Sequence, residues 1–268
     1  MAFAVSPLIR GPAAPAPTMA RLAVVTGANK GVGFYIARQL QEAGLRVVIA
    51  CRSSSQDLGS DASIEAFAST METKYQQLDV LVNNAAIAFK AADPTPFKDQ
   101  TVPTLAINFF ATMRLTDRLL PLLRGSAAAG REPRVVNVAS MAGKLRQLSP
   151  ALQSEFASPM LDRPRLVALV QSFVAAVQSG KHREQGWGNS NYGMSKLAVI
   201  AYTKMLAREE GSAMRINAIC PGYCRTDMSS NRGGQSPEVG ARTATTAALL
   251  SAQGPTGAFF EHERESSW

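Results

Sequence analysis

Short apolar segments alternate with amphipathic helical segments along almost the whole chain, and this alternation constrains the fold more than any other feature. Each apolar segment has the length of one buried strand, and each helical segment is long enough to cross from one strand to the next. The pattern predicts a parallel sheet with helices on both faces, which is a doubly wound parallel α/β fold. Strands are predicted at 22–26, 46–50, 78–83, 134–139, 215–220 and 258–261, and helices at 31–43, 61–75, 103–123, 164–178, 191–209 and 237–251.

The composition suits one domain in a reducing compartment. With 268 residues and 46% hydrophobic content, the chain can build a single large core, which we place at residues 21–268. Its three cysteines have no further cysteine or histidine partners at useful spacing, which argues against a disulfide framework and against a metal site. Residues 1–20 are rich in Pro and Ala, so we expect a disordered lead or, alternatively, an organelle-targeting segment. The expected location is cytoplasmic, or an organelle under the second interpretation.

The net charge of +8 does not by itself indicate a macromolecular partner. Basic runs and basic–aromatic repeats are missing from the sequence, so a nucleic-acid partner is not expected. No apolar run approaches the ~18 residues of a membrane span, so a membrane partner is not expected either. A basic surface still attracts anionic small molecules. The composition therefore favours a small-molecule ligand.

A glycine-rich loop follows the first predicted strand and precedes the first predicted helix. Glycines allow a tight turn and a close approach of the backbone to a pyrophosphate, and the helix N-terminus offers free N–H groups to the anion. An ordinary strand-to-helix turn is the alternative interpretation. The candidate cofactor-binding residues of this loop are Gly27, Asn29, Lys30, Gly31, Val32 and Gly33.

The charges at the end of the second predicted strand indicate which dinucleotide fits. An acidic residue there would bind the ribose 2′-hydroxyl of NAD, whereas a basic residue accommodates the 2′-phosphate of NADP. Arg52 closes this strand, Lys30 lies in the glycine loop, and no acidic residue stands at the strand end. These two cations favour NADP(H), unless Arg52 is merely a solvated surface residue.

Tyr192 and Lys196 are four residues apart on a predicted helix and therefore share one face. An ammonium beside a phenol favours the phenolate, so Lys196 is expected to lower the pKa of Tyr192. The pair would then donate and accept protons near neutral pH. The spacing also arises by chance in many helices, so its meaning depends on the residues around it.

Several motifs taken together resemble the short-chain dehydrogenase/reductase family, and more narrowly its carbonyl reductase branch. They cover most of residues 21–268. The family pattern consists of residues 26–33, 83–85, Asn108, Ser140, 192–196 and 221–222 in this order, and the narrower likeness rests on 82–90, 92–97, 186–187, 225–228 and Trp268. The resemblance implies a Rossmann fold, NADPH as cofactor and a carbonyl substrate such as an aldehyde, ketone or quinone.

The resemblance also implies roles for individual residues. Tyr192 would be the general acid, Lys196 would hold the nicotinamide ribose, and Ser140 would hydrogen-bond the substrate carbonyl. Asn108 would support a water that relays protons to Lys196. A helix cap is the alternative interpretation of Ser140. Implied cofactor contacts are Asp57, Leu58, Asn84, Ala85, Tyr192, Lys196, Pro221, Gly222, Cys224, Arg225 and Thr226. Candidate substrate contacts are Ser140, Met141, Trp187 and Tyr223, of which the last three are equally compatible with plain core positions.

The chain departs from the family pattern in three places. Residues 145–187 are a long, partly helical insertion, which in similar carbonyl reductases accompanies a monomer. Ala86 stands where a glycine is usual. Only residues 53–60 join the second strand to the next helix, so an edge strand and its helix are expected to be missing. The alternative function is therefore a truncated, non-catalytic family member that binds nucleotide weakly or folds poorly.

Overall fold

In the computed structural model, which describes residues 20–51, 60–90 and 92–268, seven strands form one sheet in the order β2-β1-β3-β4-β5-β6-β7. The first six strands run parallel, and β7 pairs antiparallel with β6. This confirms the predicted doubly wound sheet. The strands are β1 (Leu22–Thr26), β2 (Arg46–Ala50), β3 (Val80–Asn83), β4 (Arg134–Val138), β5 (Arg215–Cys220), β6 (Phe259–Glu261) and β7 (Arg264–Ser266).

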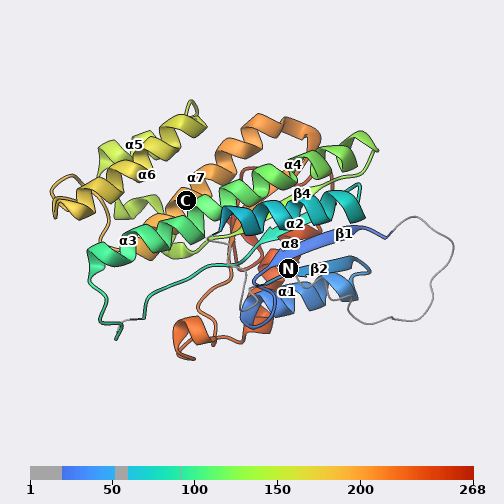
Figure 1. Cartoon of the computed structure of the whole chain (residues 1–268), viewed down its shortest axis with the longest axis horizontal. Helices are drawn as coiled ribbons and strands as arrows, with labels where there is room; N and C mark the ends of the chain where they lie inside the picture. The colour runs from blue at the N-terminus through green and yellow to red at the C-terminus, as the bar shows by residue number, and fades with distance from the viewer. Residues whose placement is uncertain (1–19, 52–59, 91) are drawn as a thin grey trace.

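Helices cover both faces of the sheet (Figure 1). On one face α1 packs against α8, and on the other face α2 packs against α4 while α7 lies against β5. The main helices are α1 (Gly31–Glu42), α2 (Asp61–Lys74), α3 (Phe97–Leu105), α4 (Thr112–Ala128), α5 (Pro150–Ala157), α6 (Arg163–Gln178), α7 (Asn191–Glu210) and α8 (Pro237–Ala248). Short helical segments are η1 (Ala106–Ala111), η2 (Met141–Gly143), η3 (Leu145–Gln147), η4 (Gly211–Ala213) and η5 (Asp227–Ser229).

The strands read as nearly continuous apolar runs because both of their faces are buried. Val24 and Leu81 belong to the core beneath α2, α4 and α7, whereas their neighbours Val25 and Val82 belong to the core beneath α1 and α8. Successive strand residues point to opposite faces, so each strand feeds both cores. This double burial fixes the sheet at the centre of the protein.

One long helical segment differs from its prediction. The sequence predicts a helix over 103–123 that uses Pro103 as an early residue, but α3, η1 and α4 follow one another without a break from Phe97 to Ala128. Pro103 and Pro121 both lie inside helices. A π-helical turn at Ala106–Ala111 connects α3 to α4 and accommodates a local loss of the regular hydrogen-bond ladder.

The predicted insertion at 145–187 contains α5 and α6, and α6 packs on α3 and α7 (Figure 1). At its end, Trp187 is 7% exposed and lies against Phe156 and Phe173, with ring centroids 6.2 and 5.7 Å away. The insertion is therefore anchored by an aromatic cluster of its own. Strand β7 is too short and too polar to have been visible as an apolar run, and the sequence analysis missed it.

The sheet positions a ligand site between β1 and β3. The strand order reverses direction there, because β2 lies on one side of β1 and β3 on the other. Ligands of open α/β sheets bind in the crevice beyond the strand ends at such a point. Among the described residues β2 has a strand partner on one side only. Residues 1–19 and 52–59 lie outside the described part, and with them the predictions for Arg52, Asp57 and Leu58.

Candidate active site

The loop between β1 and α1 packs so closely against the residues after β3 that two positions require glycine. A Cβ atom on Gly33 would lie 2.3 Å from the Asn84 Nδ2 atom and 2.5 Å from the Gly27 carbonyl oxygen. Gly27 has a φ of 63°, and a Cβ atom there would lie 3.0 Å from the Ala85 Cα atom. The glycine pattern is therefore needed for loop packing even before any ligand is considered.

Thr26 and Asn84 bind these two loops to each other. The Thr26 hydroxyl accepts hydrogen bonds from the backbone N–H groups of Asn84 and Ala85, both at 2.9 Å. The Asn84 side-chain amide donates to the carbonyl oxygens of Thr26 at 2.9 Å and Gly27 at 3.2 Å. Thr26 has a structural role at the site that the sequence analysis missed, although it stands directly at a strand end.

Helix α1 begins at this loop with backbone N–H groups that are free of a side-chain cap. Its N-cap residue is Lys30, which is extended and makes no side-chain cap hydrogen bond, and the first turn holds no acidic residue. The N-terminal end of a helix carries a partial positive charge and unpaired donors, which suit a phosphate group. The predicted anion-binding geometry is present.

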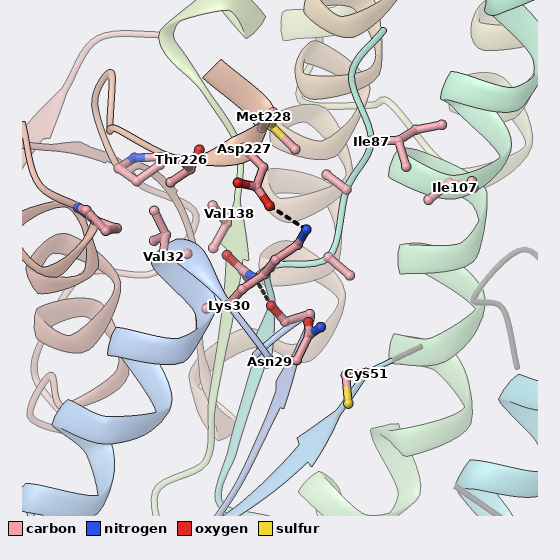
Figure 2. A pocket seen from close by; sticks show the side chains of 18 of the residues that line it. Asn29, Lys30, Val32, Cys51, Ile87, Ile107, Val138, Thr226, Asp227 and Met228 are labelled. Carbon is pink, nitrogen blue, oxygen red and sulfur yellow. Dashed lines mark hydrogen bonds and ion pairs between the residues drawn. The ribbon is translucent and has the colours of Figure 1, made fainter. Parts of the chain in front are cut away.

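A pocket of about 430 Å³ opens beside this helix end, and Figure 2 shows the side chains that line it. Three loops enclose it: the one after β1, the one after β3 and the one after β5. The predicted residues that line it are Gly27, Asn29, Lys30, Gly31, Val32, Gly33, Asn84, Ala85, Tyr192, Lys196, Pro221, Arg225 and Thr226.

Other lining residues were missed by the sequence analysis. They are mostly small or apolar: Ala50, Cys51, Ala86, Ile87, Ile107, Val138, Ala139, Asp227, Met228, Asn231 and Pro237. Position in the fold would have found several of them, because Ile87 follows β3 and Ala139 follows β4 at the same sheet edge. Gly222 and Cys224 do not line the pocket but shape its β5 loop, since Gly222 has a φ of 76° and the Cys224 thiol lies 3.2 Å from the Pro221 carbonyl oxygen.

Tyr192 and Lys196 meet on one face of α7, as their spacing predicts. The Lys196 Nζ atom lies 5.6 Å from the centroid of the Tyr192 ring and donates a hydrogen bond to the Val138 carbonyl oxygen at 2.7 Å. Lys196 is 3% exposed. The ammonium is thus held at the carboxyl end of β4, directly beside the pocket.

Burial sets the protonation of this pair. It raises the pKa of Tyr192 to about 12, with a further rise from Cys220 and an opposing effect from a hydrogen bond with Ser140. It lowers the pKa of Lys196 to about 8, partly offset by Cys220. The expected lowering of the Tyr192 pKa by Lys196 is wrong for this structure, because loss of solvation raises this pKa and the ammonium donates its hydrogen bond to Val138 instead.

Ser140 is the helix cap that the sequence allowed as an alternative, and it also contacts Tyr192. Its hydroxyl accepts a hydrogen bond from the Ala142 N–H at 3.1 Å and so caps η2, and it also hydrogen-bonds the Tyr192 side chain. The turn that follows is pressed against α7, since a Cβ atom on Gly143 would lie 2.7 Å from the backbone carbon of Lys196. Ser140 and Tyr192 are therefore brought into direct contact.

Gln147 ties the Ser140 turn to α7, and the sequence analysis missed it. Its side-chain amide donates to the carbonyl oxygens of Ala142 at 2.7 Å, Lys144 at 3.1 Å and Gly193 at 3.4 Å. Gly193 directly follows Tyr192, and a Cβ atom on it would lie 2.8 Å from the Gln147 Oε1 atom. One amide thus fixes the distance between the serine turn and the tyrosine.

Asn108 lies in the π-helical turn η1 and is 1% exposed. Its side-chain oxygen accepts from the Ile87 N–H at 2.8 Å, and its side-chain amide donates to the Ile87 carbonyl oxygen at 2.9 Å and to the Ser195 hydroxyl at 3.0 Å. These contacts place Asn108 between the loop after β3 and α7. It does not itself line the pocket.

The three candidate substrate contacts other than Ser140 have different surroundings. Met141 and Tyr223 are 48% and 61% exposed, so they are available to a ligand outside the pocket. Trp187 lies inside the aromatic cluster of the insertion, which is the plain core position that the sequence also allowed. No group of His, Cys, Asp and Glu in the described residues is arranged to hold a metal ion.

A doubly wound sheet with a glycine-lined pocket and a Ser–Tyr–Lys cluster at its strand ends defines a dinucleotide-dependent oxidoreductase. Comparison with known proteins agrees: residues 54–152 match the short chain dehydrogenase family and residues 148–254 match the enoyl-(acyl carrier protein) reductase group. The chain belongs to the short-chain dehydrogenase/reductase family.

Individual relatives cover nearly the whole chain. Carbonyl reductase (NADPH) 1 of Sus scrofa is 38% identical over 279 residues, covering 92% of this chain and 94% of that protein. Salutaridine reductase from Papaver somniferum has a similar structure, with a TM-score of 0.81, 26% identity and coverage of 90% of this chain and 99% of the other. The RhlG/NADP complex of Pseudomonas aeruginosa has a TM-score of 0.64, 26% identity and coverage of 90% and 94%.

The first alignment is longer than the 268 residues of this chain, so the relative contains residues that have no counterpart here. The short connection between β2 and α2 is the place where the sequence analysis expects them. No helix in the described residues combines the length and the apolar character that crossing a membrane requires.

Proposed function

We propose that the protein reduces carbonyl compounds, namely aldehydes, ketones or quinones, with NADPH. The observation that carries the proposal is the contact of Ser140 with Tyr192, next to Lys196, at the edge of a pocket formed by the glycine loop. The relatives named carbonyl reductase support the substrate class, and an NADP complex among the similar structures supports the cofactor.

The residues present fit a dinucleotide phosphate. Gly27 and Gly33 have no room for a side chain, α1 points an uncapped N-terminus at the pocket, and Lys30 lines it. NADPH, when bound, supplies the hydride that reaches the carbonyl carbon. We assign the holding of the phosphates to the glycine loop and the holding of the nicotinamide ribose to Tyr192 and Lys196.

Tyr192 is suited to donate the proton in the direction of reduction. Because burial raises the pKa of its phenol to about 12, the hydroxyl is protonated at neutral pH. An alkoxide is a much stronger base than a phenolate, so transfer of this proton to the nascent alcohol is favourable. Ser140, which hydrogen-bonds Tyr192, orients the carbonyl oxygen toward the same hydroxyl.

Lys196 helps to return a proton to Tyr192 after the transfer. Its ammonium faces the Tyr192 ring and is held by the Val138 carbonyl oxygen, so it stabilises the phenolate when that forms. Burial lowers the pKa of Lys196 to about 8, which makes it able to pass on a proton near neutral pH. Asn108 supports the water that reloads Lys196, a role carried by the family resemblance.

The decisive experiment follows NADPH oxidation with menadione by the purified chain. Tyr192→Phe is expected to lower turnover by about 10²- to 10⁴-fold while binding of NADP⁺ persists. Tyr75→Phe removes a phenol at the end of α2, outside the site, and should leave turnover unchanged. A folded protein that binds NADPH without turnover would instead support the truncated, non-catalytic alternative.

We further propose that the protein is a monomer, which the same resemblance supports, and that it is cytoplasmic. Helix α6 of the insertion covers α3 and α7, and this helical surface serves association in other family members. Light scattering coupled to size exclusion should give a mass near 28.5 kDa. A stable tetramer would overturn the monomer, and a fluorescent fusion found in an organelle would indicate that residues 1–20 are a targeting segment.

A further inference from the structure

An ion pair spans the mouth of the pocket. The Lys30 Nζ atom, on the loop after β1, lies 2.6 Å from the Asp227 Oδ2 atom, on the loop after β5. Both residues line the pocket, and Figure 2 shows their side chains reaching toward each other across it. Their side chains are 68% and 66% exposed, so the pair is open to solvent and to ligands.

Each residue of this pair stands at the start of a helical element. Lys30 is the N-cap residue of α1, and Asp227 begins η5. A capping box holds η5: the Thr226 hydroxyl receives a backbone N–H, and the Ser229 hydroxyl accepts from the Thr226 N–H at 3.1 Å. The pair thus connects the starts of α1 and η5 through two exposed side chains.

The Asp227 carboxylate is ionised and lies among positively charged side chains. Its hydrogen bond with Lys30 and the charge of Lys30 hold the pKa of its carboxyl below the ordinary value, and Lys90 acts in the same direction. Lys90 belongs to the loop after β3. Asp227 is therefore paired with a cation of the loop after β1 and feels the charge of a cation of the loop after β3. Its negative charge reduces the attraction that these cations offer to an anionic ligand.

We propose that Asp227 limits the affinity and the selectivity of the protein for NADP(H) by competing with the 2′-phosphate for Lys30. An ammonium is a compact charge that satisfies one anion at short range, so Lys30 cannot hold Asp227 and a phosphate at full strength. When the cofactor enters, Lys30 passes from the carboxylate to the phosphate; when it leaves, the ion pair closes again. This inference rests on the proposed function, because it deepens the role of the NADP(H) pocket.

The test measures binding by titration calorimetry with NADP⁺ and with NAD⁺, which lacks the 2′-phosphate. Asp227→Asn frees Lys30 and is expected to tighten NADP⁺ binding by about two- to fivefold, with little change for NAD⁺. Lys30→Met is expected to weaken NADP⁺ binding by about tenfold. Glu42→Gln removes an equally exposed carboxylate, paired with Arg38 at the far end of α1, and should leave both ligands unchanged.

The double variant decides how Asp227 acts. If it acts through Lys30, Asp227→Asn has no effect in the Lys30→Met background. Tighter NADP⁺ binding that persists in that background would show direct repulsion of the phosphates and overturn the inference. An Asp227→Asn protein that binds NADP⁺ no better, or gains equally for NAD⁺, would overturn it as well.

Two further measurements are the dependence of NADP⁺ binding on ionic strength and dinucleotide binding by the wild-type chain. The gain in Asp227→Asn should shrink when the ionic strength rises from about 0.1 to 1 M, because exposed charges are screened; a gain that does not depend on salt contradicts the competition. A wild-type chain that binds neither dinucleotide overturns the proposed function and this inference together. Normal NADP⁺ binding with an unresponsive Asp227→Asn variant overturns this inference alone.

Discussion

Around Ser140 and Tyr192 the polar contacts are made largely to backbone atoms of packed elements, whereas at the pocket mouth Lys30 and Asp227 meet as two exposed side chains. In the first region, several contacts fix the position of the Ser140 turn on α7: Gln147 donates to three carbonyl oxygens, and Gly143 packs against the backbone of α7. The second region depends on one ion pair in water. In the proposed mechanism, proton transfer therefore relies on fixed geometry, while recognition of the cofactor phosphate relies on charge that can be exchanged.

The largest expected effect sharpens this comparison at the glycine loop, which is a closely packed part of the cofactor end of the pocket. In Gly33→Ala the new methyl group would lie 2.5 Å from the Gly27 carbonyl oxygen and 2.3 Å from the Asn84 Nδ2 atom, so the backbone of the glycine loop must shift. We expect NADP⁺ binding to weaken by at least about 100-fold, measured by calorimetry. Gly125→Ala is the matched control, because its nearest neighbour would be 3.6 Å away and alanine favours a helix. Wild-type affinity in Gly33→Ala would show that the loop is not rigid.

The second prediction concerns the buried lysine and uses pH. The folded pKa of Lys196 is lowered to about 8 from the ordinary 10.5, so between these values the unfolded chain binds more protons. The free energy of unfolding should therefore rise with pH across this window, by about 1–2 kcal/mol between pH 8 and 9.5. Tyr192 acts oppositely above pH 10, because its folded pKa is raised.

Urea unfolding at several pH values checks this prediction by comparing the rise in the free energy of unfolding between variants and the wild type. Lys196→Met should show a smaller rise than the wild type, while Lys74→Met, at an exposed position, should match the wild type. Parallel curves for all three proteins would mean that Lys196 is solvated enough to keep its charge without penalty.

The third prediction sharpens the comparison by loosening the catalytic end without removing a catalytic group. Gln147→Met keeps the length of the side chain but loses its three hydrogen bonds, so the Ser140 turn is free to move from Tyr192. We expect kcat to fall by about tenfold and the Kd for NADP⁺ to stay within about twofold. Gln153→Met loses a single amide bond within the insertion and serves as control. A change in Kd with constant kcat would place Gln147 in cofactor binding instead.

The smallest effect is expected at the C-terminal end of the described chain. The Trp268 indole N–H donates to the Gly143 carbonyl oxygen at 2.8 Å, and Lys204 lies 5.8 Å from the Trp268 ring. Trp268→Phe keeps a ring for Lys204 but removes the hydrogen bond, at a cost of about 1 kcal/mol in the free energy of unfolding. Urea unfolding measures this cost, and an unchanged midpoint would show that Gly143 is held by α7 alone.

The sequence predicted most of the fold because strand and helix periods are strong signals in a doubly buried sheet. All six predicted strands, such as Leu22–Thr26 and Arg215–Cys220, are confirmed. The predictions fail where contacts with distant parts of the chain outweigh local sequence preferences. Pro103 looks like a helix start, yet the helix begins at Phe97, and β7 is a polar strand that only its pairing with β6 defines.

The site was predictable where a residue's role follows from its spacing, as for Tyr192 and Lys196. It was not predictable where the role depends on a distant partner. Gln147 contacts Gly193 and Asp227 contacts Lys30 across long stretches of sequence. Gln147 belongs to no recognisable local pattern, and the 225–228 motif that contains Asp227 does not indicate its partner. The direction of the Tyr192 pKa shift was also missed, because spacing shows the neighbouring charge but not the loss of solvent around the phenol.

The π-helical turn at Ala106–Ala111 acts as a phase shift in the long helical segment. A π-helical turn contains more residues than an α-helical turn, so one additional residue rotates everything that follows by about 100°. Asn108 sits inside the turn, while Leu115 and Leu119 of α4 are buried in the core beyond it. Deleting one residue there would force a choice between aiming Asn108 at Ile87 and burying the apolar stripe of α4. The additional residue of the π-helical turn therefore couples the direction in which the Asn108 side chain points to the packing of α4.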